Sequence, residues 1–259
     1  MSEPGRAAGI LFDLDGTVYQ EGRAIPGAAA ALEALRRRGL PFRFTTNTTR
    51  RPRAALAARL REMGIPAQPE EILSAPAAAA RWLRDREVRR VQLLLAEATF
   101  EEFSGLEIVD RAPEVVVVGD LGEGWTFSLL NQAFRNLMDG AELLAIQRNR
   151  YWHTDGGLSL DAGPFVAALE YGSGQTATLV GKPSPAFFAA AARELGLPPE
   201  RIAVVGDDLE SDVAGARAAG MLGLAVRTGK YRPQDEEGAR QAADVVLDSI
   251  ARVPGWLGF

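Results

Sequence analysis

The chain has 259 residues, of which 47% are hydrophobic and 24% charged, and its net charge at pH 7 is -5. These values are typical of a globular protein, and the acidic balance offers no overall basic field to nucleic acid or to an anionic membrane surface. The absence of cysteine excludes disulfides, thiolate nucleophiles and Cys-ligated metal sites, and the single histidine, His153, excludes a site built from several histidines. No apolar run reaches the roughly 20 residues of a membrane helix, and the N-terminus lacks a secretory pattern. We therefore expect a cytoplasmic protein with neither nucleic acid nor membrane as a partner.

The first part of the chain predicts alternating strands and helices. An apolar run over 9–13 that ends in carboxylates and Gly16 is typical of a buried parallel strand followed by a loop. A helix is predicted over 28–38, a strand over 42–45, and a second helix from Pro52 to a stop near Gly64.

The same alternation returns towards the C-terminus. We predict a strand over 177–180, a helix over 184–196 capped by Ser184, a strand over 202–205, a helix over about 211–219 and a strand over 222–226. Such alternation predicts a mostly parallel sheet, and ligands of these sheets bind beyond the carboxyl ends of the strands.

The middle of the chain predicts a second α/β domain. It contains apolar strands at 91–96, 115–118 and 143–146, and an amphipathic helix over 126–138. We therefore predict an α/β protein whose discontinuous core domain, 1–77 and 175–259, is interrupted by an inserted domain at 78–174.

Carboxylates gather where two of the predicted core strands end. Asp13 and Asp15 follow the first strand, where they could be two ligands of a hard cation, a nucleophile and an acid/base, or only turn and cap hydrogen-bond acceptors. Asp207 and Asp212 belong to a dense acidic stretch after the strand 202–205, which would repel itself if buried without a cation. Mg²⁺ suits such a site. Capping of the next helix by Ser211 and Asp212 is the simpler alternative, but it does not explain Asp207.

Two further loops could bind an anion. Thr46 and Asn47 lie in a threonine-rich turn after the strand 42–45, where hydroxyls, an amide and backbone N–H groups precede a helix; a plain turn is the alternative. Lys182 lies in a loop between Gly181 and Pro183, where its ammonium could balance phosphate and carboxylates, although a lone lysine is ordinarily a solvated surface residue.

These loops together resemble the motifs of the haloacid dehalogenase (HAD) superfamily of phosphatases over essentially the whole chain. The matching residues are Asp13-x-Asp15-Gly16-Thr17, Thr46-Asn47, Lys182 and Gly206-Asp207-x-x-x-x-Asp212. The place of the insertion resembles the C2-type cap of the NagD-like branch (subclass IIA). Three stretches look most like the phospholysine phosphohistidine inorganic pyrophosphate phosphatases: 180–185, 227–230 and 158–171. That group carries Ser where this chain keeps Asp15, which favours ordinary phosphoester hydrolysis here.

The resemblance implies a Rossmann-like HAD core, a C2 cap and a Mg²⁺-dependent hydrolysis. Asp13 would attack phosphorus and form an aspartyl-phosphate, while Asp15 would act as general acid and then general base. The other implied roles are metal binding by the Asp13 carboxylate, the Asp15 backbone carbonyl and the Asp207 carboxylate; phosphate binding by Thr46, Asn47 and Lys182; and orientation of metal-bound waters or of Lys182 by Asp208 and Asp212.

The cap is implied to select the leaving group through the loop that follows the strand 143–146. Its candidate residues are Asn149, Arg150, Tyr151 and Trp152, whose aromatic rings could stack on a planar substrate and whose arginine could pair with a second anionic group. Packing of the two aromatic rings between cap and core is an equally good interpretation.

We expect the partner to be a small phosphorylated metabolite, and a homodimer, where one forms, to use the cap. The alternatives are an inorganic pyrophosphatase or P–N bond phosphatase, and a non-catalytic phosphate-binding module on the same fold.

Overall fold

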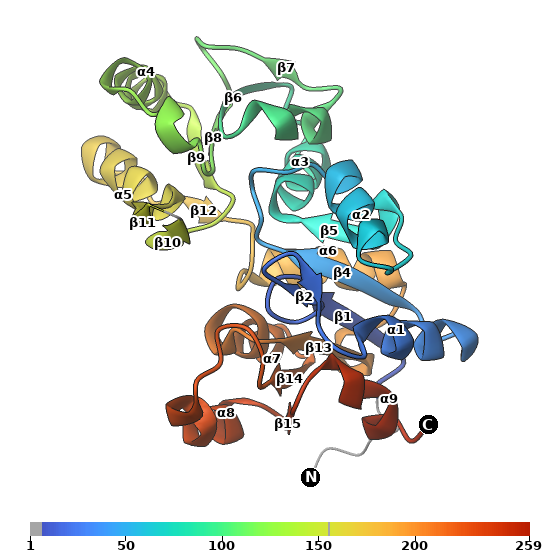
Figure 1. The fold of residues 1–259 in the computed structure, drawn as a ribbon. Coiled ribbons are helices and arrows are strands. Elements are labelled where there is room, and N and C mark those ends of the chain that lie inside the picture. Colours follow the sequence, from blue (N-terminus) through green and yellow to red (C-terminus); the bar gives the residue numbers. More distant parts are fainter. Residues whose placement is uncertain (1–6, 155) are drawn as a thin grey trace. The chain divides into compact units, whose positions relative to one another are not determined.

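The computed structural model describes residues 7–154 and 156–259, and only the backbone of residues 152–154. The chain divides into two compact units. Unit 1 comprises Met1–Thr46, Arg53–Leu73 and Lys182–Phe259, and unit 2 comprises Asn47–Pro52 and Ser74–Gly181 (Figure 1). The inserted domain predicted at 78–174 lies within Ser74–Gly181 of unit 2, and unit 2 also contains Asn47–Pro52, the segment after the strand predicted at 42–45.

Unit 1 is built on a six-stranded sheet in the order β15-β14-β13-β1-β4-β5, in which the strands from β15 to β4 pair in parallel. Its strands are β1 Gly9–Asp13, β4 Phe42–Thr46, β5 Ile72–Ser74, β13 Ile202–Gly206, β14 Leu222–Val226 and β15 Val245–Leu247, with a small hairpin of β2 Tyr19–Gln20 and β3 Arg23–Ala24. Its helices are α1 Ala28–Arg37, α2 Arg53–Glu62, α6 Pro185–Leu195, α7 Gly215–Ala218, α8 Glu236–Ala242 and α9 Val253–Trp256, and its short helical turns are η2 Pro69–Glu71, η5 Pro199–Arg201, η6 Leu209–Ala214, η7 Pro233–Asp235 and η8 Ile250–Arg252.

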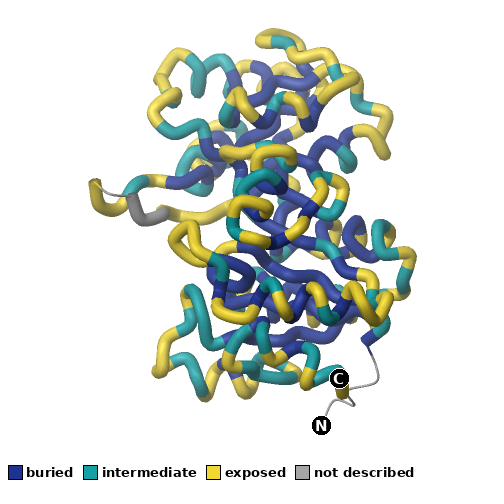
Figure 2. The backbone as a smooth tube through the Cα atoms, turned by 45° about the vertical axis from the view of Figure 1, so that its right-hand side comes forward, coloured by how far each residue is buried: buried dark blue, intermediate teal, exposed yellow. Residues whose placement is uncertain are grey.

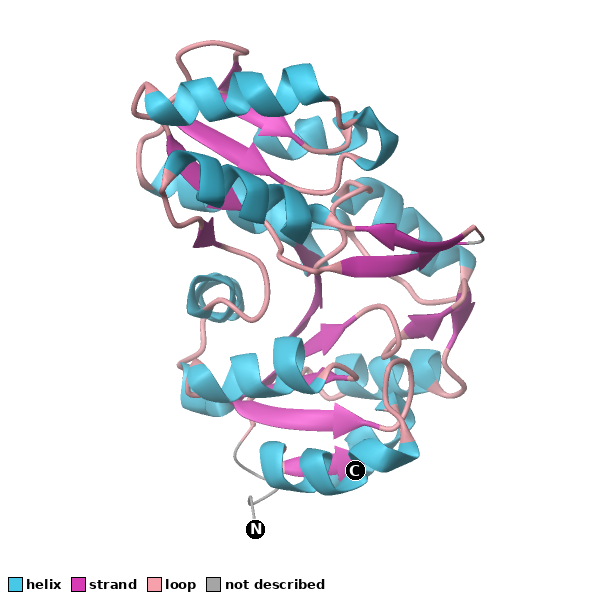
Figure 3. Cartoon of the chain, turned by 90° about the vertical axis from the view of Figure 1, so that its left-hand side faces the viewer, coloured by secondary structure: helices cyan, strands magenta, loops and turns pink. Residues whose placement is uncertain are grey.

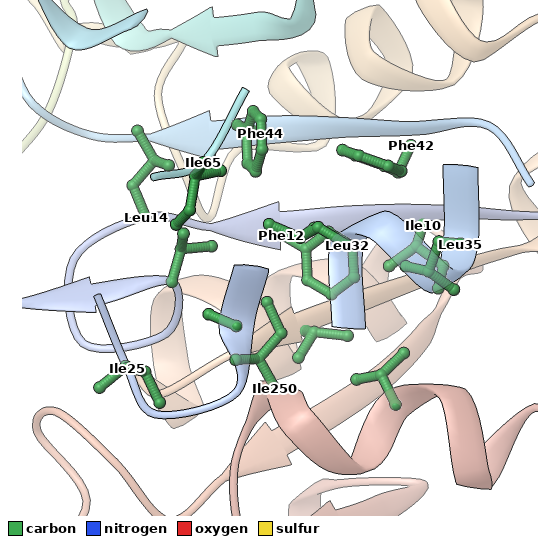
Figure 4. Close-up of a cluster of buried hydrophobic side chains, with 14 of the residues drawn as sticks. Ile10, Phe12, Leu14, Ile25, Leu32, Leu35, Phe42, Phe44, Ile65 and Ile250 are labelled. Carbon is green, nitrogen blue, oxygen red and sulfur yellow. The ribbon is translucent and has the colours of Figure 1, made fainter. Parts of the chain in front are cut away.

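The core of unit 1 follows from the pattern of apolar residues. In α1, Ala28, Ala31, Leu32 and Leu35 are buried, the spacing that places side chains on one helix face. Figure 4 shows Leu32 and Leu35 against the β1 side chains, with the rings of β4 alongside them in the same cluster. Both α1 and β1 are therefore held by burial of apolar surface on one face of the sheet.

Unit 2 contains a five-stranded sheet in the order β12-β9-β8-β6-β7, whose neighbouring strands pair in parallel. Its strands are β6 Arg90–Leu94, β7 Glu107–Ile108, β8 Val115–Val118, β9 Glu142–Ala145 and β12 Thr178–Leu179, with an antiparallel hairpin of β10 Tyr151–Thr154 and β11 Gly157–Leu160. Its helices are α3 Ala75–Asp85, α4 Phe127–Met138 and α5 Ala162–Ser173, and its helical turns are η3 Glu97–Phe103 and η4 Gly122–Gly124.

Each face of this second sheet is covered by helical segments. Side chains of α3 and η3 join one apolar cluster with the strands, and side chains of α4 and α5 join the other (Figure 3). In both units the buried residues follow the sheet strands while the exposed residues lie on loops and outer helix faces (Figure 2). No helix in the described parts of the chain has the length and apolarity to cross a membrane.

The strand predicted over 177–180 lies in a different sheet from the one we assigned. It is reduced to β12, which pairs with β9 in unit 2, and unit 1 resumes at Lys182. A short apolar run shows that a strand forms but carries no information on its partner, which tertiary pairing decides.

Candidate active site

The order of the strands brings the first and last acidic motifs to one edge of the sheet. Asp13 is the last residue of β1, and Asp207 directly follows β13. The two strands are parallel neighbours with Phe12 opposite Val205, so both aspartates leave the sheet at its carboxyl edge. From β1 the sheet continues to β4 and β5 on one side and to β13, β14 and β15 on the other, so the strand order reverses here, at the topological switch point where such sheets bind ligands.

Lys182 lies between two buried carboxylates at this edge. Its Nζ donates hydrogen bonds to Asp13 Oδ1 at 2.5 Å and to Asp212 Oδ1 at 2.6 Å. The side chains of Lys182 and Asp212 are only 3% and 1% exposed. Water therefore screens these charges little, and each charged group depends on its partners.

The turn after β13 explains how Asp212 reaches this cluster. Asp208 is the N-cap of η6, and its Oδ1 accepts hydrogen bonds from the backbone N–H groups of Glu210 and Ser211 at 3.0 and 2.9 Å. A Cβ on Gly206 would stand 2.3 Å from Asp212 Oδ2, so the glycine provides the space that this carboxylate occupies. The suggested capping by Ser211 and Asp212 is thus wrong: the helical conformation begins earlier, and Asp208 caps it.

Asp15 lies apart from the buried carboxylates. Its side chain is exposed, and its Oδ2 accepts a hydrogen bond of 3.0 Å from the hydroxyl of the buried Tyr19. Burial, together with the negative charge of Asp15, raises the pKa of Tyr19, so the phenol remains a proton donor at neutral pH.

Thr46 and Asn47 lie at the carboxyl end of the neighbouring strand β4. Thr46 ends β4 and is buried, at the same edge of the sheet as Asp13 because β4 pairs in parallel with β1. Asn47 is the next residue and the first residue of unit 2. Its side chain lies close to Gly181 of the same unit, because a Cβ on Gly181 would stand 2.9 Å from Asn47 Oδ1. Binding of phosphate by these two residues stays a prediction.

Burial and mutual repulsion change the acidity of the cluster. Burial is the largest effect on Asp13 and raises its pKa; Lys182 opposes this, while the charges of Asp212 and Asp207 add to it. Burial and Asp212 raise the pKa of Asp207 to about 6, against a hydrogen bond from the backbone of Lys230. Burial alone would lower the pKa of Lys182, but Asp13 and Asp212 raise it, so the ammonium stays charged.

The carboxylates can also hold a divalent cation. Asp13, Asp207 and Asp212 each offer an oxygen within 4.8 Å of the others, and all three residues are buried. Hard cations prefer such oxygen ligands, and a cation would relieve the repulsion that raises the pKa values of Asp13 and Asp207. Asp13 Oδ1 and Asp212 Oδ1 both accept from Lys182, but Asp212 Oδ2 also accepts from the backbone N–H of Asp208 at 3.3 Å, so Asp13 and Asp207 are the better placed ligands.

A loop that received no role in the sequence analysis also reaches this site. Thr228 Oγ1 donates to the backbone carbonyl of Gly16 at 2.5 Å, and the backbone N–H of Lys230 donates to Asp207 Oδ2 at 2.6 Å. The available signal was position: a polar, glycine-containing loop directly follows the buried strand 222–226, at the edge where the other motif loops lie.

The predicted substrate loop lies in unit 2, at the base of the β10–β11 hairpin. The backbone carbonyl of Asn149 accepts from Gly163 N at 3.0 Å, and that of Arg150 accepts from Asp161 N at 3.3 Å. Tyr151 is 52% exposed and pairs with Leu160 across the hairpin. The side chain of Trp152 lies outside the described residues, and contact of this loop with a substrate stays a prediction.

Comparison with protein families and solved structures gives consistent results. A model described as haloacid dehalogenase-like hydrolase matches residues 10–108, and a model of HAD-hydrolase-like proteins matches residues 179–253. The human haloacid dehalogenase-like hydrolase domain-containing protein 2 is 44% identical over 88% of this chain and 87% of its own length. The human phospholysine phosphohistidine inorganic pyrophosphate phosphatase is 37% identical over 94% of this chain and 91% of its own length.

Two solved structures share the fold over nearly the whole chain. The p-nitrophenyl phosphatase from Archaeoglobus fulgidus superposes with a TM-score of 0.89 at 29% identity, covering 96% of this chain and 99% of its own. NagD from E. coli superposes with a TM-score of 0.87 at 26% identity, covering 95% of this chain and 97% of its own. The chain therefore belongs to the haloacid dehalogenase-like hydrolases and, within them, to the C2-capped, NagD-like phosphatases of subclass IIA.

Proposed function

We propose that this protein is a Mg²⁺-dependent phosphatase that hydrolyses small phosphorylated metabolites through an aspartyl-phosphate on Asp13. The observation that carries the proposal is the buried cluster in which Lys182 bridges Asp13 and Asp212 while Asp207 lies beside them. A carboxylate nucleophile, a fixed ammonium and a second carboxylate for a cation are the groups that phosphoryl transfer from an ester to an aspartate requires.

In the first half of the reaction, an oxygen of Asp13 forms a bond to phosphorus as the bond from phosphorus to the ester oxygen breaks. The leaving oxygen takes a proton from Asp15. In the second half, a water gives its proton to the Asp15 carboxylate and attacks phosphorus, which releases Asp13 and inorganic phosphate. The exposed side chain of Asp15 supports this exchange of protons, and the hydrogen bond from Tyr19 to its Oδ2 holds the carboxylate in place.

The residues that would hold Mg²⁺ are the carboxylates of Asp13 and Asp207 and the backbone carbonyl of Asp15. When bound, the cation supplies positive charge that reduces the repulsion between Asp13 and an anionic phosphate. Lys182 supplies a second positive charge, because its ammonium already contacts the nucleophilic carboxylate at 2.5 Å. Thr46 and Asn47 would donate to the remaining phosphoryl oxygens, and Asp208 and Asp212 would orient metal-bound waters or Lys182.

The leaving group would be selected by the hairpin loop of unit 2, through Asn149, Arg150, Tyr151 and Trp152. Hydrolysis of pyrophosphate or of a P–N bond is the second candidate, and its support is the 37% identity to the human phospholysine phosphohistidine inorganic pyrophosphate phosphatase.

A non-catalytic phosphate-binding module has less support, because Asp13, Asp15, Lys182 and Asp207 are all retained. Dimerisation through the cap and residence in the cytoplasm stay predictions.

The test is phosphate release from a panel of phosphoesters, pyrophosphate and a phosphoramidate, each assayed with Mg²⁺ and with EDTA. We expect release from at least one phosphoester with Mg²⁺, reduction to the background rate with EDTA, and recovery when excess Mg²⁺ is added back. The preferred substrate then identifies the class of leaving group. A rate that is the same with and without EDTA would refute the metal dependence, and no release from any substrate would favour the binding module.

The pH dependence of cation binding should follow Asp207. Its pKa of about 6 without a cation means that protons compete with Mg²⁺ for this carboxylate below that pH. We expect the Mg²⁺ dissociation constant to change little from pH 8 to 7 and to rise by up to about tenfold per pH unit as the pH falls below 6. Calorimetric titration with Mg²⁺ across this range measures the effect, and an affinity independent of pH between 7 and 5 would contradict the raised pKa of Asp207.

A further inference from the structure

The loop formed by residues 228–230, after β14, contacts two separate parts of the candidate site. Through the Thr228 hydroxyl it holds the carbonyl of Gly16, which lies in the turn after Asp13 and Asp15, at 2.5 Å. Through the backbone N–H of Lys230 it holds Asp207 Oδ2 at 2.6 Å. One short loop thus joins the segment that follows β1 to the carboxylate that follows β13.

Two glycines allow this close approach. Gly16 and Gly229 have φ angles of +84° and +62°, in the left-handed region that favours glycine. A Cβ built on Gly229 would stand 2.1 Å from Asp207 Oδ2 and 2.5 Å from the Cα of Gly16, and a Cβ on Gly16 would stand 2.3 Å from the same Asp207 oxygen. The Asp207 carboxylate is therefore packed against both glycines, and a side chain on either would displace it.

The hydrogen bonds distinguish the two oxygens of Asp207. Oδ2 accepts the short bond from Lys230 N, whereas Oδ1 receives, among the described residues, only a contact of 3.5 Å from Thr17 Oγ1. A carboxylate whose first oxygen is held by a backbone donor has its second oxygen in a defined direction, and such outer contacts orient metal ligands. Oδ1 is thereby the oxygen left to coordinate a cation.

The side chain of Lys230 has a lesser part in this arrangement. Its Nζ contacts Asp208 Oδ2 at 2.6 Å, but the lysine side chain is 69% exposed. Solvent screens such a pair, so its contribution is small. The contacts to the site come from the backbone of Lys230, the absence of a side chain at Gly229 and the hydroxyl of Thr228.

We propose that the 228–230 loop is a positioning element for cation binding. It fixes Asp207 Oδ2, which leaves Asp207 Oδ1 for the cation, and it holds the turn at Gly16 through the hydroxyl of Thr228. The inference rests on the cation site of the proposed function. It assigns Thr228 and Gly229 as positioning residues, which act through Asp207 and Gly16 and need no contact with the substrate.

The experiment measures binding of Mn²⁺, a paramagnetic substitute for Mg²⁺, to the full chain from the resonance signal of the free ion. We expect Gly229→Ala to weaken Mn²⁺ binding by at least about tenfold, because the new Cβ must move Asp207. The matched control is Gly39→Ala: Gly39 has a φ of +66°, and a Cβ there would meet nothing within 4 Å. It imposes similar backbone strain away from the site, so Mn²⁺ binding should stay within about twofold of the wild type.

A second pair of variants keeps the test independent of backbone strain. Thr228→Val keeps the side-chain volume but removes the donor, whereas Thr228→Ser keeps the donor. We expect Thr228→Val to weaken Mn²⁺ binding and to raise the Mg²⁺ concentration for half-maximal phosphate release about tenfold, with kcat at saturating Mg²⁺ changed less. Thr228→Ser should keep Mn²⁺ binding and the half-maximal Mg²⁺ concentration close to the wild-type values.

Unchanged Mn²⁺ binding in both Gly229→Ala and Thr228→Val, with normal binding in the wild type, would overturn the positioning role and leave the proposed function intact. Absence of Mn²⁺ and Mg²⁺ binding in the wild type would overturn both. A loss shared equally by Gly39→Ala would mean that the effect is general strain, and it would also refute the inference.

Discussion

Asp13→Asn is expected to reduce phosphate release by about 10⁴-fold or more on every substrate that the wild type hydrolyses, the scale seen when a catalytic nucleophile is removed. The amide has nearly the shape of the carboxylate but is a far weaker nucleophile, so the aspartyl-phosphate cannot form. The measurement is kcat at saturating Mg²⁺ and substrate. The fold should persist, because Lys182 keeps its bond to Asp212.

Two controls separate chemistry from structure in this experiment. Thermal unfolding should show that Asp13→Asn remains folded, since the change also removes one charge from a cluster in which Asp212 and Asp207 repel Asp13. Asp139→Asn, at an exposed position after α4, should retain wild-type kcat. If Asp13→Asn kept more than about a tenth of the wild-type rate, another group would be the nucleophile.

Lys182→Met is expected to have the largest effect on stability. The substitution leaves Asp13 and Asp212 buried without their shared cation, and removing one partner of a buried ion pair costs about 3–5 kcal/mol. It should also lower kcat/KM by about 10²-fold or more, because a fixed positive charge beside the nucleophile is lost. Urea unfolding in EDTA measures the first effect, and steady-state kinetics measure the second.

The stability loss in Lys182→Met should depend on pH with a definite sign. Without the lysine, which lowers the pKa of Asp13, that pKa rises further above its value in the unfolded chain, so the folded state binds more protons. The difference in unfolding free energy from the wild type should therefore shrink as the pH falls from 8 to 5. Lys230→Met is the matched control: its side chain is 69% exposed, and the loss of its pair with Asp208 should cost less than about 1 kcal/mol. An equal loss in both variants would contradict the buried pairing of Lys182.

Much of the candidate site could be predicted because it depends on where parallel strands end. The apolar runs before Asp13 and Asp207 identify two buried strands. Because strands alternate with helices along the chain, the two strands are expected to be parallel, so their carboxyl ends lie at the same edge of the sheet. The same reasoning places Thr46 at that edge through β4. Local patterns suffice here because helices between the strands favour parallel pairing, and the residues at the end of each strand mark where it stops.

Contacts between segments far apart in the chain could not be predicted from the sequence in the same way. The bond from Thr228 to Gly16 joins residues 212 positions apart, and neither residue type indicates the other. The hydrogen bond from Tyr19 to Asp15 and the capping of η6 by Asp208 depend on how a turn closes, which side-chain pattern alone leaves open.

The amino-acid sequence by itself determined the family, the α/β class and the residues of the motif loops, because these follow from short patterns of apolar and acidic residues. Only the tertiary structure decided that β12 belongs to the sheet of unit 2, that Lys182 bridges Asp13 and Asp212, and that the 228–230 loop holds Asp207. The reason is physical: burial forces each charged or hydrogen-bonding group to find a partner, and which partner it finds depends on packing of the whole sheet rather than on its neighbours in the chain.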